Sequence, residues 1–237
     1  MKSNSIFLFF CNKITKIKNT LLNLVESSLR NISGGIGQKL RFMYYKHRFK
    51  SCGNGVKIDS HVFIYNPENI SIGDDVWIMP FTILHGGNKD KLNGNRVLLK
   101  NNKHLICHDE TLLVIGSQVS IGSHSIIHGY GGLEIEDKVT ISARVSIYSF
   151  SHYPFNPLRK TEVTYANSMI KTDPIVCIQS PIKISSGVWL GLGVTVYGGN
   201  IGKNTFVTTN SIVINGVPEN CIASGHPANK IKDRFEL

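Results

Sequence analysis

Charged residues are scarce in this chain, and its cysteines follow no pattern. Asp, Glu, Lys and Arg make up 18% of the 237 residues, against about a quarter in an average soluble protein. The five cysteines are scattered and include no C-x-x-C pair, which argues against a disulfide framework and favours free thiols in a reducing compartment. The apolar run at residues 6–11 is too short for the core of a secretory signal and far too short to cross a bilayer. These absences predict a cytoplasmic protein.

Acidic residues are almost missing from the first 50 positions. Glu26 is the single acid there, beside ten Lys or Arg, so most of the net charge of +10 lies in the first fifth of the chain. Apolar residues recur at helical spacing over residues 14–29, and Gly34-Gly35 separates them from a second such stretch. We expect residues 1–50 to form a basic amphipathic helical segment. Its role is open between attachment to the inner face of a membrane, a cap on the following domain, and a merely solvated basic face.

What the chain has in abundance is a six-residue repeat. From about residue 56 it divides into hexads that open with an aliphatic residue and often carry a small or β-branched residue four positions later. A period of six does not fit a helix, but it fits short strands joined by tight turns, three strands to a coil. We expect one β-helical domain over residues 51–237, with insertions near 86–112 and 153–182, where solenoids often place binding loops. The clearest hexads open at Ile115, Ile121, Ile135, Ile141, Ile147, Ile184, Leu190, Ile201 and Val207.

Four motifs near the C-terminus narrow the class of protein. They are Val188-Trp189-Leu190-Gly191, Gly198-Gly199-Asn200-Ile201-Gly202, Ser211-Ile212-Val213 and Gly225-His226-Pro227-Ala228. With the hexads, they make residues 56–235 resemble the hexapeptide-repeat acyltransferases, a family that includes galactoside, maltose, polysaccharide and xenobiotic acetyltransferases. We therefore expect a mainly β protein: a left-handed parallel β-helix with the N-terminal amphipathic helices and a short C-terminal helix. The resemblance also implies a homotrimer with active sites between subunits, acetyl-CoA as co-substrate and no metal.

His152 is the candidate catalytic base. It ends three hexads that open at Ile135, directly before the second insertion, and the resemblance implies the catalytic histidine at this place. Imidazole suits the role because its reference pKa of about 6.5 lets it accept a hydroxyl proton at neutral pH. The resemblance further implies that the backbone N–H of Leu192 stabilises the oxyanion that develops on the thioester carbonyl. The alternative for His152 is a surface position without function.

Seven further residues are candidates for binding CoA. Glycines keep the surface low enough for an extended ligand, lysines suit its phosphates, and the outward tryptophan suits the pantetheine arm. The family's G-A-G is Thr208-Thr209-Asn210 in this chain, which changes the fit of that arm. Each candidate also has a structural alternative, as a packed ring, a tight turn or a solvated basic tail. The seven are Trp189, Gly191, Gly193, Thr209, Asn210, Lys230 and Lys232.

Three other residues are candidates for binding the acceptor. His124 and His128 lie one coil before His152, and each either lines the acceptor site or is a surface residue. Arg159 lies in the second insertion, where its cation suits an acidic sugar or a phosphate.

The favoured function is acetyl-CoA-dependent O-acetylation of a sugar hydroxyl in a surface polysaccharide or its lipid-linked precursor, with residues 1–50 near the membrane. A xenobiotic O-acetyltransferase is the first alternative, because Tyr153-Pro154-Phe155-Asn156 resembles a stretch of that group. A γ-type carbonic anhydrase would need zinc held by His124, His128 and His152. A non-catalytic scaffold is the third alternative. The sequence contains no nucleic-acid recognition motif, so we expect no nucleic-acid partner.

Overall fold

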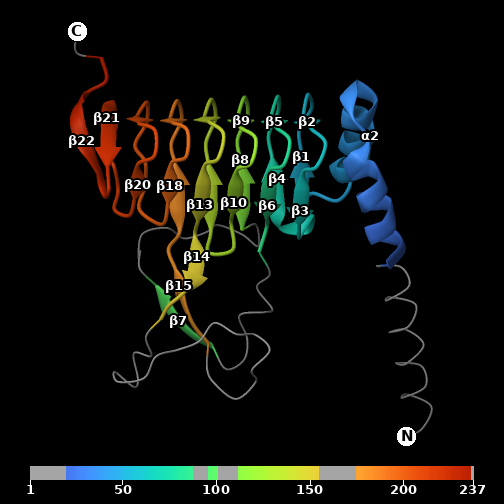
Figure 1. The fold of residues 1–237 in the computed structure, drawn as a ribbon, viewed down its shortest axis with the longest axis horizontal. Coiled ribbons are helices and arrows are strands. Elements are labelled where there is room, and N and C mark those ends of the chain that lie inside the picture. Colours follow the sequence, from blue (N-terminus) through green and yellow to red (C-terminus); the bar gives the residue numbers. More distant parts are fainter. Residues whose placement is uncertain (1–19, 88–95, 101–111, 155–174, 236–237) are drawn as a thin grey trace, which may run out of the picture.

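The computed structural model describes residues 20–87, 96–100, 112–154 and 175–235. Residues 20–31 and α2 (Gly34–Lys46) are helical, and a row of stacked coils follows them along the long axis of the molecule (Figure 1). Each full coil gives one short strand to each of three sheets, and within the stack these strands pair in parallel. A period of six residues produces this arrangement because each hexad supplies one strand and one turn.

The three faces of the stack are named sheets A, B and C. Sheet A contains β1 (Ser51–Cys52), β4 (Ile70–Ile72), β8 (Leu113–Ile115), β11 (Leu133–Ile135) and β16 (Ile182–Ile184), with the short helix η1 (Pro67–Asn69) before β4. Sheet B contains β2 (Lys57–Ile58), β5 (Trp77–Ile78), β9 (Ser120–Ile121), β12 (Thr140–Ile141), β17 (Trp189–Leu190), β19 (Phe206–Val207), β21 (Cys221–Gly225) and β22 (Ala228–Asp233). Sheet C contains β3 (Phe63–Tyr65), β6 (Ile83–His85), β10 (Ile126–His128), β13 (Ser146–Tyr148), β18 (Thr195–Val196) and β20 (Ile212–Val213).

The core is made of the aliphatic residues that open the hexads. Strand pairing places equivalent hexad positions one above another, so each inward side chain rests on its counterpart in the next coil. No single coil encloses enough apolar surface to be stable alone, and stacking supplies the core. One such column, in which every member is at most 1% exposed, is Ile58, Ile78, Ile121, Ile141, Leu190 and Val207.

The turn that joins sheet B to sheet C, called the B–C corner, keeps one backbone shape from coil to coil. Its last residue has a φ near +60° in each coil. From His124 onward that residue's N–H donates to the turn of the coil before, as in Gly193 N to Ala143 O at 3.1 Å and Asn210 N to Leu192 O at 2.8 Å. The corner is therefore a straight edge of stacked turns. Its last residues, in order, are His61, Phe81, His124, Arg144, Gly193 and Asn210.

The helices close the N-terminal end of the stack. Arg41 on α2 is 1% exposed and donates from Nε to Ile58 O (2.8 Å) and from Nη1 to Leu29 O (2.8 Å) and Ile32 O (2.6 Å). One guanidinium thus ties both helices to the first coil, and Tyr45 of α2 joins the core beside it. The described part of the predicted basic segment acts as a cap. Residues 1–19 lie outside the described residues.

The segment 20–31 also carries an unpacked apolar face. Leu21 is 58% exposed and Leu24 61% exposed, and the helix runs outward from the stack toward the N-terminus (Figure 1). Within the described ranges, no helix is long and apolar enough to cross a membrane.

The prediction of a short C-terminal helix was wrong, because β22 is a strand antiparallel to β21. The chain reverses at His226-Pro227, and β21 would otherwise present a sheet edge with unpaired backbone groups. Pairing with that edge satisfies more backbone groups than one isolated helical turn would. Arg234 then holds the end of the strand by donating from Nη1 to Asn204 O at 2.7 Å.

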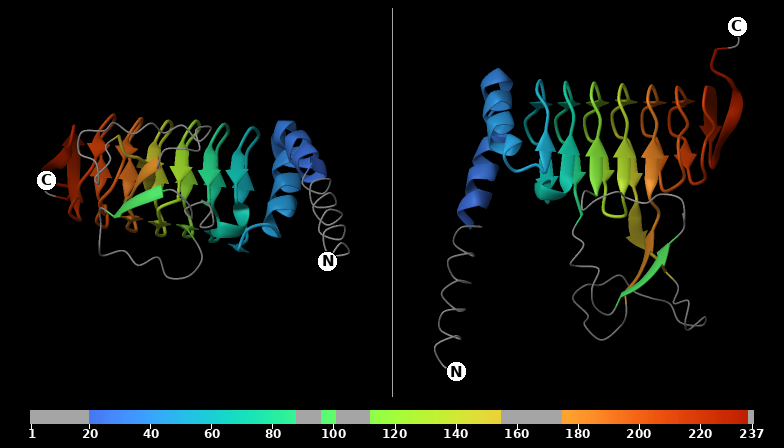
Figure 2. Two further views of the ribbon diagram at one scale, coloured as in Figure 1. Left: turned by 90° about the horizontal axis from the view of Figure 1, so that it is seen from below. Right: turned by 180° about the vertical axis from the view of Figure 1, so that it is seen from behind.

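Both insertions contribute to a small sheet D beside the stack. It contains β7 (Arg96–Lys100), β14 (Phe150–His152) and β15 (Ile175–Gln179), in the order β14-β15-β7. Figure 2 shows it projecting from the middle of the stack, where the chain leaves sheet C after β13.

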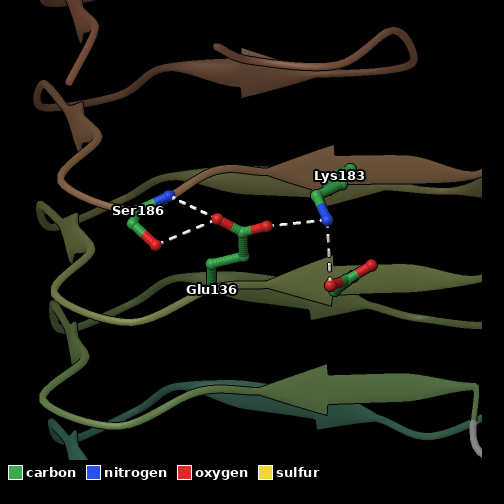
Figure 3. Close-up of polar contacts among 4 residues, drawn as sticks. Glu136, Lys183 and Ser186 are labelled. Carbon is green, nitrogen blue, oxygen red and sulfur yellow. Dashed lines mark hydrogen bonds and ion pairs between the residues drawn. The ribbon is translucent and has the colours of Figure 1, made fainter. Parts of the chain in front are cut away.

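A polar cluster on sheet A joins two successive coils. The second insertion leaves the stack after the first of these coils, and the chain returns to the stack in the second. Lys183 Nζ lies 3.1 Å from Glu134 Oε1 and 2.7 Å from Glu136 Oε1. The other oxygen of Glu136 accepts from the N–H and the hydroxyl of Ser186, each at 2.9 Å (Figure 3). The contacts lower the pKa of Glu136, chiefly through Lys183, and raise the pKa of Lys183, chiefly through Glu136. The cluster thus secures the returning chain against the preceding coil.

Candidate active site

His152 lies at the exposed end of β14, just outside the stack. Its strand runs antiparallel to β15, with His152 opposite Cys177, and Tyr153 N donates to Val176 O at 2.9 Å. The ring of Phe150 meets the imidazole edge-on, with ring centres 6.4 Å apart. The backbone of the candidate base is therefore held in a sheet while its side chain stays open to a ligand.

Ser149 fixes the point where β14 leaves the stack. This fully buried residue donates to His128 O from its hydroxyl at 2.8 Å and from its N–H at 3.2 Å. The hydroxyl oxygen in turn accepts from Gly131 N at 2.9 Å, and Ser149 O accepts from Ser180 N at 2.8 Å. A Cβ at Gly131 would lie 1.8 Å from Ser149 O, so glycine is required for this close approach.

His128 lies on the outer face of sheet C among aromatic rings. Its ring centre is 4.8 Å from that of His85, 6.0 Å from that of Tyr130 and 5.7 Å from that of Tyr148. Phe150 completes the surround at 6.4 Å. Burial, with a smaller contribution from His85, lowers the pKa of His128 to about 4, so the ring is neutral at physiological pH.

Leu192 is the middle residue of the B–C corner in the coil of β17 and β18. Gly191 N donates to Val207 O at 2.8 Å and Gly193 N to Ala143 O at 3.1 Å. Among the described residues the N–H of Leu192 has no protein acceptor, and its side chain is 45% exposed. The turn thus presents a backbone donor outward, in the coil directly after the one from which β14 departs.

The predicted CoA-binding residues gather at the C-terminal half of the stack. Gly191 and Thr209 belong to successive B–C corners, and a Cβ on Gly191 would lie 2.7 Å from Thr209 N. Gly193 and Asn210 are likewise neighbours on this edge, which glycine keeps flat.

The tryptophan and the lysines lie on sheet B. Trp189 is 47% exposed, packs edge-on against Phe206 and donates from Nε1 to Ser142 Oγ at 3.1 Å. Register carries the same row through Ile222 to Lys232 on β22. Lys230 makes an ion pair with Asp233. Trp189 and the cation Lys232 therefore lie on one outward row, with Phe206 and Ile222 between them.

His124 and His128, two of the three predicted acceptor contacts, lie on different parts of the stack. His124 is exposed on the B–C corner, where it stacks on Phe81 with ring centres 4.9 Å apart, whereas His128 points from sheet C. Arg159 lies outside the described residues. Within the described part of the chain, no three His, Cys, Asp or Glu side chains lie close enough to hold a metal ion.

Sequence reasoning missed the residues that surround His128. His85 lies one coil before it and is its partner in the strand register. Tyr130 follows β10, Ser149 follows β13, and Phe150 is the first residue of β14. The hexad frame places His85, His128 and Tyr148 at one equivalent position. An alignment of the coils across the first insertion would therefore have shown that these three residues form a column.

Comparison with known proteins was made by sequence and by fold. No family model matches the chain. A putative acetyltransferase of Saccharomyces cerevisiae is 33% identical over 125 residues, which cover 49% of this chain and 57% of that protein. The dTDP-4-amino-4,6-dideoxy-D-glucose acyltransferase of Escherichia coli is 32% identical over 51% of this chain and 54% of its own length. The chain thus spans about half the length of the curated relatives it matches.

The fold comparison covers more of the molecule. A crystal structure of the N-acyltransferase AntD from Bacillus cereus, in complex with dTDP and coenzyme A, matches 82% of this chain and 89% of that one, with a TM-score of 0.63 and 24% identity. The chain has the hexapeptide-repeat acyltransferase fold. The resemblance predicted from the hexads is confirmed, and so is the left-handed parallel β-helix.

Proposed function

We propose that this hexapeptide-repeat protein is an acetyl-CoA-dependent O-acetyltransferase that acts on a sugar hydroxyl of a surface polysaccharide or its lipid-linked precursor. Two observations carry the proposal. His152 is exposed at the end of β14, and the N–H of Leu192, at the B–C corner of the following coil, has no acceptor among the described residues. These are the base and the oxyanion donor that acyl transfer requires.

In this proposal His152 accepts the proton of the sugar hydroxyl as the hydroxyl oxygen attacks the acetyl carbonyl. A general base of this kind contributes about 10²–10⁴ to the rate. The N–H of Leu192 donates to the oxyanion that develops on the carbonyl oxygen. The imidazolium of His152 then returns its proton to the departing thiolate of CoA, so the histidine ends the cycle neutral.

The flat edge at Gly191, Gly193, Thr209 and Asn210 supports a place for the pantetheine arm of the co-substrate. Lys232, on the same outward row as Trp189, suits the CoA phosphates because it is an exposed cation. We further propose that the enzyme works as a homotrimer with these surfaces at the subunit contacts. A molecular mass from light scattering equal to a single chain would contradict that assembly.

The N-terminal segment supports a position at the membrane. Leu21 and Leu24 are exposed, and the first 50 residues of the sequence carry most of the net positive charge, a combination that suits the anionic inner leaflet. We propose that this segment caps the stack through Arg41 and also holds the enzyme near a lipid-linked acceptor.

A second candidate is N-acylation of a nucleotide-linked amino sugar. It is favoured by the names of two relatives, the E. coli acyltransferase of a dTDP-linked 4-amino sugar and the B. cereus N-acyltransferase bound to dTDP. The same base and donor would serve an amine acceptor.

The test is thiol release from acetyl-CoA by the full-length chain, with neutral saccharides and dTDP-linked amino sugars as acceptors. Turnover that depends on a saccharide hydroxyl supports O-transfer, and turnover with the amino sugar alone supports the second candidate. Absence of CoA binding by the folded protein would contradict both.

A further inference from the structure

Both tryptophans of the chain lie on the outward face of sheet B. Trp77 is 43% exposed and Trp189 is 47% exposed. Strand register places them in one row, through Ser120 and Thr140, so that they are three coils apart. At ~4.8 Å from strand to strand, the two backbone positions are separated by about 14 Å.

The two indole rings are held in the same way. Trp77 donates from Nε1 to Asp59 Oδ2 at 2.8 Å, and Trp189 donates from Nε1 to Ser142 Oγ at 3.1 Å. In each case the acceptor lies two residues after the tryptophan's strand partner in the preceding coil. One hydrogen bond thus orients each ring while much of its surface stays exposed. A ligand that covers rings already held in place loses little side-chain entropy on binding.

Two coils with hydroxyl side chains separate the two rings. Ser120 and Thr140 occupy the intervening outward positions, and Ser142 adds a hydroxyl at the edge of the same face. A face of this composition differs from the continuous apolar core of a subunit contact. It combines the two kinds of group that recognise sugars, aromatic rings for the C–H faces and hydroxyl groups for the oxygen atoms.

Sheet B is on the opposite side of the stack from sheet D. Both insertions leave the stack after strands of sheet C, β6 and β13, and the chain returns in sheet A, so sheet B is the third side of each coil. Figure 1 shows β2, β5 and β9 on one side of the stack and β7, β14 and β15 on the other. The row of tryptophans is therefore separated from sheet D by the width of the stack.

We propose that the sheet B row from Trp77 to Trp189 binds an extended, unbranched glycan chain that runs along the axis of the stack. In a chain of equatorially linked pyranoses, each unit advances by about one strand spacing, ~5 Å. Sugars three units apart therefore fall on the two tryptophans, and the units between them lie over Ser120 and Thr140. The inference rests on the proposed function in one respect, that the bound glycan carries the hydroxyl that is acetylated.

Trp77 carries the test, because Trp189 is also a predicted contact of CoA. The probes are the β-1,4-linked disaccharides and hexasaccharides of glucose, mannose, xylose and N-acetylglucosamine, titrated by calorimetry into the full-length chain without CoA. At least one hexasaccharide should bind about tenfold more tightly than its disaccharide, because it reaches both rings at once. Trp77→Ala should weaken that hexasaccharide about tenfold, whereas Trp77→Phe, which keeps a ring, should stay within about threefold of wild type. Tyr65→Ala, at an exposed ring of sheet C, is the matched control and should bind as wild type does.

Intrinsic fluorescence locates the ligand, since the sequence contains no other tryptophan. In Trp189→Phe, saturation with the same hexasaccharide should shift the emission of Trp77. The inference is overturned if no hexasaccharide binds more tightly than its disaccharide, if Trp77→Ala binds like wild type, or if the emission of Trp77 stays unchanged.

Light scattering and the transfer assay separate the remaining outcomes. A lower molecular mass of Trp77→Ala than of wild type would also overturn the inference, because Trp77 would then serve contact between copies of the chain. The proposed function fails separately: if the hexasaccharide binds through Trp77 but no saccharide releases thiol from acetyl-CoA, the glycan row stands and acetyl transfer does not.

Discussion

Ser149 donates twice to a single acceptor, the carbonyl oxygen of His128. The residue that starts the departure of β14 is thus bonded to the residue that ends β10 in the coil before. The position of His152 therefore depends on the coil that carries His128, because only Phe150 and Ser151 separate His152 from this anchor. The position of the candidate base, His152, is therefore coupled to that of the candidate acceptor contact, His128.

Replacement of that anchor should affect both stability and turnover. Ser149→Ala removes the hydroxyl bond to His128 and leaves the buried N–H of Gly131 without its acceptor, so unfolding free energy should fall by about 1–3 kcal/mol. The turnover number should also fall, because β14 loses its anchor. Urea denaturation and thiol release measure the two effects.

A second buried serine is the control for that experiment. Ser125 links adjacent coils through Ser142 O and Val145 N, away from β14. Ser125→Ala should lose comparable stability and keep its turnover number. Equal losses of turnover in both variants would mean that Ser149 acts through stability alone.

The His152 side chain should matter to chemistry and little to folding. His152→Ala should lower acceptor-dependent thiol release about 10²–10⁴-fold, with an unchanged melting temperature because the residue is exposed. His47→Ala, at an exposed histidine after α2, is the control. Wild-type turnover in His152→Ala would remove it as the base.

The backbone donor of Leu192 can be tested with proline. Proline removes the N–H, and Pro80 already occupies the equivalent corner position in an earlier coil, so the turn accepts it. Leu192→Pro should lower the turnover number about 10²–10³-fold, and Leu192→Ala, which keeps the N–H, should stay within about threefold of wild type. Circular dichroism checks the fold. Equal turnover in the two variants would contradict the oxyanion role.

The polar cluster of Glu134, Glu136, Lys183 and Ser186 on sheet A should make the free energy of unfolding depend on pH in the acid range. Its contacts lower the folded-state pKa of Glu136 below the ordinary value of about 4.3, so the contribution is complete above that value and is lost as pH falls through the folded pKa. Glu136→Gln should remove this part of the acid slope in urea denaturation between about pH 5 and pH 3. The effect should be small, because the side chain is about a third exposed. Identical acid slopes in wild type and variant would exclude it.

Membrane attachment should depend on the apolar face of residues 20–31. The double variant Leu21→Gln with Leu24→Gln should float less with vesicles containing phosphatidylserine and should keep its thermal stability, because both side chains are exposed. Ile214→Gln, at an exposed apolar residue of the stack, is the control. Equal flotation of all three proteins would rule out this face as the attachment surface.

The stack could be predicted from sequence because each hexad carries its own inward residue. The inward positions of Ile121 and Ile141 follow from their own hexads, without reference to neighbouring coils. The same hexad frame led to His152, which ends the run of hexads that opens at Ile135. The column of His85 and His128 could not be placed in this way. The first insertion interrupts the frame between them, so their register depends on hydrogen bonds between coils and not on a count of residues.

Local pattern also failed at both ends of the stack. A short C-terminal helix was predicted, but the conformation of Ala228–Asp233 is set by the open edge of β21, which lies outside the segment itself. Arg41 looked like one more surface cation of a basic helix. Its side chain is buried because it bonds to three carbonyl groups from two separate parts of the chain, Leu29 and Ile32 in one and Ile58 in the other, which converge only after folding.

The two closed ends also govern how copies of this protein can meet. A coil with bare backbone at its rim is a template on which another molecule could continue the stack, and repetition of that contact would build a fibre of unlimited length. Here α2 covers one rim and β22, running against the direction of the strands, covers the other. Continuation of the stack by a second molecule is hindered at the α2 end and at the sheet B edge of the other end, which favours contact between copies through the lateral faces.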